Sequence, residues 1–135
     1  MNSKIFKIFS SRFSMNPPLQ REEIIKILAS KEISHPPSEF IEFYLNFNGS
    51  KVLIGNAMWN FWKITECYLS KFNERDFLCF CDAYLETPIY GISINIGDPT
   101  FGKIFDLTYK STIGLHLYEF LDKVQSDIDF FVQID

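Results

Sequence analysis

The sequence predicts an α+β fold, in which a mostly antiparallel, twisted sheet of about five or six strands has helices packed around it. Two observations support this prediction. Apolar residues recur at helical spacing up to residue 50 and again from residue 115, whereas the period of two residues that is typical of strands dominates between them. The expected strands are joined by short turns, which connect antiparallel strands because a parallel return needs a crossover of a dozen or more residues.

Three helices are expected in the first third of the chain. The first spans residues 3–14, and the second follows Asn16-Pro17-Pro18. The third begins after Pro36-Pro37, and Gly49 is expected to close it in the left-handed conformation. Their apolar stripes are Ile5, Ile8, Phe9 and Phe13 for the first, Ile24, Ile27 and Leu28 for the second, and Phe40, Phe43, Tyr44 and Phe47 for the third.

The rest of the chain reads mainly as strands. Short strands are expected at 51–54 and 59–64, followed by a short helix capped by Thr65 that runs through Phe72. Three strands in hairpin series should cover 77–84, 89–95 and 101–107. A last helix fits 115–124, and the acidic, aromatic tail at 127–135 suits an extra strand or a helix.

Length and composition predict one domain covering residues 1–135, because 47% hydrophobic content provides a sizeable core. The net charge is −4, with nine basic and six acidic residues up to Asn73 and four basic and eleven acidic residues after it. This balance argues against nucleic-acid binding, which normally needs a basic patch. No apolar run approaches the 18 residues of a membrane span. The acidic C-terminal half suits either a basic partner or a simply solvated surface.

Residues for catalysis or metal binding are sparse. Cys79 and Cys81 stand two apart on an expected strand, so they should share a face, and free thiols in a reducing cytosol explain the odd total of three cysteines. Zinc would need four convergent ligands, and His35 and His116 stand at no ligand spacing. The sequence therefore predicts no catalytic residue, no metal site and no cofactor.

Two features qualify as partner-binding residues. Trp59 and Trp62 stand on one short strand, where alternation of faces turns them to opposite sides, so at least one of them can be exposed. Acidic residues at strand ends and turns form the second feature, since they would steer a basic protein toward this surface. They are Asp82, Glu86, Asp98 and Asp106.

The order of elements and the residues at their boundaries resemble the SUKH superfamily, which includes the Smi/Knr-like cell-wall regulators of yeast and many bacterial immunity proteins. Ile33 to Tyr44 is similar to the family's "(I/L)P...(Y/F)..F" helix, and Asn48-Gly49 is similar to its Asn-Gly-Gly, with Ser50 in place of the second glycine. Further similar segments are Trp62 to Glu66, Phe77 to Leu107 and Ile113 to Leu121. The resemblance covers residues 19–125, which leaves the helix at 3–14 and the acidic tail at 126–135 as extensions.

This resemblance implies a non-catalytic binding protein that neutralises a cognate toxin, often a basic nuclease, in the cytoplasm of the producing cell. It also implies the SUKH type of α+β fold. The alternatives are a scaffold or regulatory interaction module of the Smi/Knr type and a small-ligand-binding domain. The resemblance leaves the oligomeric state open.

Overall fold

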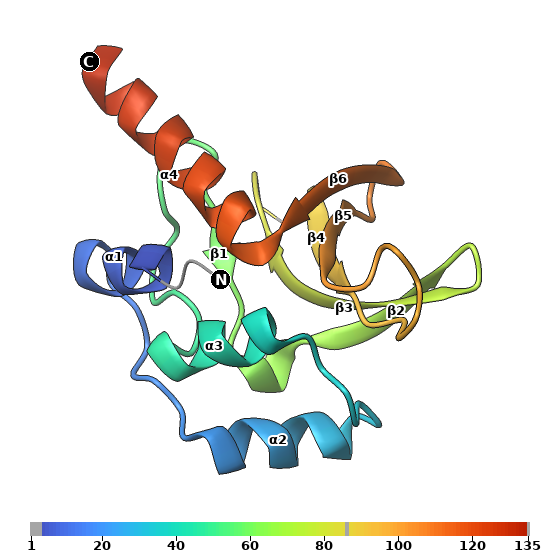
Figure 1. Cartoon of the computed structure of the whole chain (residues 1–135). Helices are drawn as coiled ribbons and strands as arrows, with labels where there is room; N and C mark the ends of the chain where they lie inside the picture. The colour runs from blue at the N-terminus through green and yellow to red at the C-terminus, as the bar shows by residue number, and fades with distance from the viewer. Residues whose placement is uncertain (1–3, 86, 135) are drawn as a thin grey trace.

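The computed structural model describes residues 4–85 and 87–134, and it confirms the predicted α+β fold with four helices and a curled antiparallel sheet (Figure 1). The helices are α1 (Lys4–Arg12), α2 (Arg21–Ser30), α3 (Ser38–Asn46) and α4 (Leu117–Ile134), with a 3-10 turn, η1, at Ile64–Glu66. The strands are β1 (Asn60–Phe61), β2 (Tyr68–Phe72), β3 (Arg75–Asp82), β4 (Ile89–Ser93), β5 (Lys103–Asp106) and β6 (Ser111–His116).

Strand β3 organises the sheet. The strands follow the order β1-β3-β4-β5-β6, and β2 also pairs with β3, beside β1. All pairings are antiparallel, with Asn60 opposite Asp82 and Tyr68 opposite Cys79. The end of β3 therefore meets β1 while its first half meets β2, so that residues from both short strands converge near Asp82.

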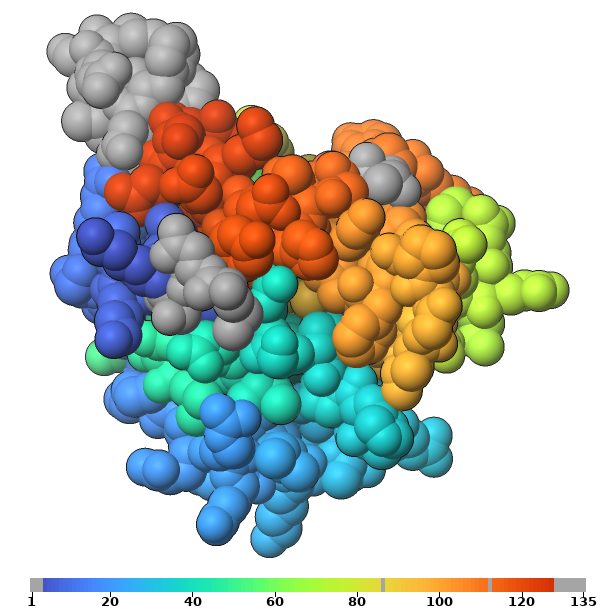
Figure 2. Space-filling model, viewed as in Figure 1, coloured from blue at the N-terminus to red at the C-terminus, as the bar shows by residue number. Residues whose placement is uncertain are grey.

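The helices gather on one side of the curled sheet (Figure 1). Helices α3 and α4 contact each other, and α2 borders α3 on the side away from α4 (Figure 2). The fully buried ring of Phe43 lies at the centre of the aromatic core. Its centroid is 5.9 Å from those of Phe6 and Phe61 and 6.1 Å from that of Phe80, which ties α1, α3, β1 and β3 together.

Several expected boundaries hold. Helix α1 lies within the expected range of 3–14, and α3 begins at Ser38, directly after the two prolines. Strands β3, β4 and β5 fall close to the expected ranges of 77–84, 89–95 and 101–107. Apolar periodicity located α1 and α3 because each helix turns one stripe toward the core, whereas β3, β4 and β5 contain continuous buried runs and were located by the turns between them.

Other expectations were wrong. The helix expected from Thr65 to Phe72 is the η1 turn followed by β2. Asn73 and Glu74, with φ values of 51° and 62°, form a tight turn of the type that joins two strands, so β2 pairs back onto β3. The segment 51–54 contributes only an isolated bridge between Ile54 and Trp59. The last helix begins at Leu117, after the unexpected β6, and continues through the tail to Ile134.

Two local expectations also need correction. Gly49 has the expected positive φ of 79°, but it does not close α3, which ends at Asn46 with Phe47 in extended conformation. Cys79 and Cys81 do not share a face. Cys79 pairs with Gly91 and Cys81 with Tyr90, so β3 has one extra residue here, and this β-bulge breaks the alternation of its side chains. This bulge turns Cys81 into the core under the helices, whereas the thiol of Cys79 interacts with Tyr68.

Candidate functional site

A concave site of about 480 Å³ lies where β1, η1 and β2 converge on the end of β3. We call it the Asp82 pocket. Its lining residues come from β1, η1, β2, β3 and β4 and from the connections beside them, and none of those described carries a positive charge. They are Asn60, Trp62, Glu66, Tyr68, Asp82, Thr87 and Ile89.

Asp82 forms the buried acidic part of this pocket, with only 4% of its surface exposed. Its Oδ2 accepts a hydrogen bond of 2.6 Å from Trp62 Nε1 and a longer one of 3.4 Å from Asn60 Nδ2. The pairing of Asn60 with Asp82 in the sheet places these groups together, and the backbone N–H of Trp62 donates to Phe80 O at 2.9 Å. These two neutral donors help to orient the carboxylate.

Trp62 and Tyr68 form the aromatic wall of the Asp82 pocket. Their rings stack with centroids 5.5 Å apart and planes 20° apart, and Tyr68 is 46% exposed. Burial of its hydroxyl, followed by interaction with Cys79, raises the pKa of Tyr68 above its usual value of 10.0, so the phenol is neutral at physiological pH. A second carboxylate, the exposed Glu66, lines the same pocket.

The connection between β3 and β4 borders the Asp82 pocket and presents two exposed apolar side chains. Tyr84 and Leu85 are 59% and 62% exposed, and both have left-handed backbone, with φ values of 50° and 60°. Such conformations are uncommon for bulky residues and cost of order 1–3 kcal/mol each. Hydrogen bonds from Tyr84 N to Ala57 O (2.6 Å) and from Thr87 N to Ala83 O (2.9 Å) hold the segment in place. We call it the Tyr84-Leu85 segment.

The six predicted partner-binding residues do not form one surface. Trp62 and Asp82 meet in the Asp82 pocket. Trp59 is buried against Phe61, Tyr90 and Phe120 in the core. Asp106 is also buried, and its Oδ1 accepts hydrogen bonds of 3.0 Å from the backbone N–H groups of Thr108 and Tyr109. Glu86 lies outside the described residues.

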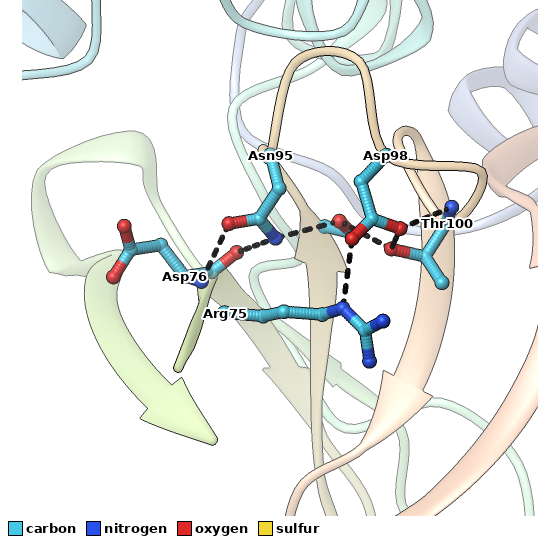
Figure 3. Close-up of polar contacts among 6 residues, drawn as sticks. Arg75, Asp76, Asn95, Asp98 and Thr100 are labelled. Atoms are coloured by element: carbon cyan, nitrogen blue, oxygen red, sulfur yellow. Dashed lines mark hydrogen bonds and ion pairs between the residues drawn. The ribbon is translucent and has the colours of Figure 1, made fainter. Parts of the chain in front are cut away.

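Asp98 organises the turn between β4 and β5 (Figure 3). Its Oδ2 accepts from Arg75 Nε at 2.8 Å, and its Oδ1 accepts from Thr100 N at 2.8 Å and from Thr100 Oγ1 at 2.7 Å. Asn95 adds a second link, because its amide bonds to both backbone groups of Asp76. These bonds tie the turn to the start of β3, so Asp98 has a structural role.

The sequence did not indicate the Tyr84-Leu85 segment. Neither residue type normally signals a left-handed turn, and the segment falls partly within the strand expected at 77–84. Exposure of these side chains follows from the pairing of β3 with β4 and from the hydrogen bond to Ala57, which only the tertiary structure shows. The sequence offered one signal. Glu86-Thr87-Pro88 has the composition of a turn, and large apolar residues such as Tyr84 and Leu85 are unusual beside a turn.

The thiols of this chain are poorly suited to nucleophilic chemistry. All three cysteines are free and buried. Burial raises the pKa of Cys67 to about 12 and that of Cys79 to about 11, and it raises the pKa of Cys81 as well, so each thiol stays protonated at neutral pH. Among the described residues, no group of three or more His, Cys, Asp or Glu side chains is placed to hold a metal ion.

Comparison with known proteins does not assign a family to the site described above. In the part of the chain that the structure describes, no helix has both the length and the apolar character needed to cross a membrane. In comparisons with family models, curated proteins and solved structures, nothing matches this chain.

Proposed function

We propose that this protein is a non-catalytic binding protein, an immunity protein that neutralises a cognate toxin by direct contact in the cytoplasm of the cell that makes both. The observation that carries the proposal is the exposed Tyr84-Leu85 segment, held in left-handed backbone beside the Asp82 pocket. Strained backbone that presents exposed apolar groups is more typical of a recognition site than of a simple connection.

The side chains and the backbone hydrogen bonds of this segment suit it to act as an anchor. Tyrosine is a favoured anchor of protein interfaces, and a leucine beside it adds apolar area that a partner can cover. Because the backbone on both sides is hydrogen-bonded, little conformational entropy is lost when the two side chains are buried. The connection runs between Asp82 and Thr87, which both line the Asp82 pocket, so one partner surface can cover the anchors and the pocket together.

The charge of the chain supports a basic partner. The part from Glu74 onward has eleven acidic and four basic residues, and the Asp82 pocket contributes two carboxylates. A toxin that acts on nucleic acid carries a basic surface because its substrate is polyanionic. Attraction between such surfaces speeds association, which suits a protein that must capture a toxin before it acts. The resemblance to SUKH immunity proteins adds to this argument.

Co-expression tests the proposal. The toxin encoded beside this gene is produced in cells with and without this protein, and we expect growth only when the protein is present. Replacing Tyr84 or Leu85 by alanine should weaken binding of the purified toxin by about tenfold or more, as for a central interface anchor. Ile25→Ala is the matched control, because Ile25 is an exposed apolar residue on α2, outside the Asp82 pocket.

Two results would contradict the proposal. The first is a neighbouring gene that encodes no toxin, and the second is a toxin that kills cells equally with and without this protein. The unfolding midpoint separates a folding defect from a lost contact, and we expect it to stay unchanged because both side chains are exposed. An unchanged unfolding midpoint together with weaker binding is the expected pattern.

A further inference from the structure

We propose that the Asp82 pocket binds an arginine side chain of the partner, with the guanidinium group against the carboxylates of Asp82 and Glu66 and beside the rings of Trp62 and Tyr68. This inference rests on the proposed function and adds the chemistry by which the partner is recognised. It follows from the charge, the aromatic lining and the shape of one pocket.

The carboxylates define the sign of the ligand. Asp82 is buried, and two of the groups that donate to its carboxylate, Trp62 Nε1 and Asn60 Nδ2, are neutral. Burial is the main cause of the raised pKa of Cys81, the neighbouring residue on β3, and the charge of Asp82 is the second cause. Glu66 adds a second carboxylate on the same pocket. An anionic group would be repelled here, whereas a cation gains attraction.

The aromatic wall favours a cation that can stack. Trp62 and Tyr68 both line the pocket, and their ring planes differ by only 20°. A cation near the face of tryptophan or tyrosine is attracted by the negative potential of the ring, and tryptophan gives the strongest interaction. The hydrogen bond from Trp62 Nε1 to Asp82 fixes the indole beside the carboxylate, so both attractions are available to one ligand group.

Arginine meets these requirements better than lysine. Its guanidinium is planar, stacks on aromatic rings and donates through several N–H groups to a carboxylate, whereas the lysine ammonium is compact and strongly hydrated. The pocket volume of about 480 Å³ falls within the usual range of ligand sites and is large enough for one long side chain. The Tyr84-Leu85 segment beside it would contact the partner surface from which this arginine projects.

Titration with a small probe tests the inference without the partner. N-acetyl-arginine N-methylamide is added to the ¹⁵N-labelled full chain, and the two indole N–H signals are followed by NMR. We expect the signal of Trp62 to shift in a saturable way, with a dissociation constant of about 1 mM for a single side chain. The indole of Trp59, which is buried in the core, serves as an internal control and should not move.

Matched probes and variants identify the chemistry. The neutral isostere N-acetyl-citrulline N-methylamide should cause no saturable shift, and the lysine analogue should bind more weakly. Asp82→Asn keeps an acceptor for Trp62 but removes the charge, so binding should weaken by about tenfold or more. Glu66→Gln, at an exposed position that leaves the fold intact, should weaken binding roughly two- to fivefold. Asp122→Asn, an exposed acid on α4, is the charge control and should change nothing.

The inference is overturned if the arginine probe causes no saturable shift of the Trp62 indole, or if the citrulline probe shifts it equally. Either result leaves the proposed function standing, because protection from the toxin and the effect of Leu85→Ala are measured separately. Conversely, the proposed function is overturned if the protein fails to protect cells from the toxin, even where the arginine probe binds.

Discussion

Gly49 lies where the chain that leaves α3 crosses β1, and no other residue fits this crossing. Its φ is +79°, and a Cβ added to it would lie 2.5 Å from Phe61 O and 2.7 Å from the carbonyl carbon of Trp62. Neighbouring bonds hold the crossing tight: Asn48 Oδ1 accepts from Ile64 N at 2.9 Å, and Asn16 N donates to Gly49 O at 2.9 Å. The Asn48-Gly49 pair therefore positions β1, and with it Trp62.

Replacing Gly49 by alanine should lower the free energy of unfolding by roughly 2–5 kcal/mol, because left-handed strain and a clash with backbone atoms add together. Gly97→Ala is the matched control. Gly97 has a similar φ of +82°, but nothing lies within 4 Å of an added Cβ, so only strain of about 1–2 kcal/mol is expected. Urea denaturation measures both variants. Equal losses at the two positions would show that the close approach to β1 has no energetic consequence.

At the scale of elements, the turn between β4 and β5 depends on one ionised side chain. Three hydrogen bonds to Thr100 and Arg75 lower the pKa of Asp98 from 3.8 to about 2. A carboxyl whose pKa is lower in the folded state contributes stability above the unfolded-state pKa and loses that contribution as pH falls toward the folded-state value. The turn should therefore weaken between about pH 4 and pH 2.

Asp98→Asn tests this dependence. The free energy of unfolding of the natural chain should fall more steeply between about pH 4 and pH 2 than that of the variant, because only the natural chain takes up a proton at Asp98 on unfolding in this range. Urea titrations at several pH values measure the difference. Glu42→Gln, on α3 and outside this turn, is the control and should keep the steep acid limb. Parallel curves for the natural chain and Asp98→Asn would contradict the assigned role.

The elements differ in how well sequence predicts them, and the reason is physical. The apolar stripes of α1, α2 and α3 can be recognised in the local sequence because each helix buries one face. Strand β2 has mostly exposed side chains and exists because the turn at Asn73 and Glu74 returns it to β3. Local pattern alone could not reveal that pairing.

The residues of the candidate site were likewise only partly predictable from the local sequence. The expectation that Trp59 and Trp62 differ holds, although the strand expected at 59–64 is reduced to β1: Trp59 is buried in the core, and the half-buried Trp62 lines the Asp82 pocket. Acidic residues at strand ends appeared suited to the surface, but Asp82 and Asp106 are buried because nearby N–H groups satisfy them. Proximity of Trp62 to Asp82 depends on the register of β1 against β3, which no local signal specifies.

At the scale of the whole molecule, one apolar cluster joins all four helices to the sheet. It includes Phe6 of α1, Leu28 of α2, Phe43 of α3 and Leu121 of α4, together with Phe80 and Ile104 of the sheet. Cys67 and Cys81 belong to this cluster, whereas Cys79 is buried outside it, beside Tyr68. Chemical labelling of the three thiols therefore monitors opening of the interior on both sides of β3.

Because these thiols are buried and protonated, their modification requires opening of the core. In pulse labelling with a maleimide at neutral pH, we expect native protein to carry no label and unfolded protein to carry three, with the labelled fraction following global unfolding as urea rises. Mass spectrometry counts the labels. Ser10→Cys, exposed on α1, should label at once and shows that the reagent is active. Molecules with one or two core labels would instead mean that β3 opens on one side while the rest of the core stays closed.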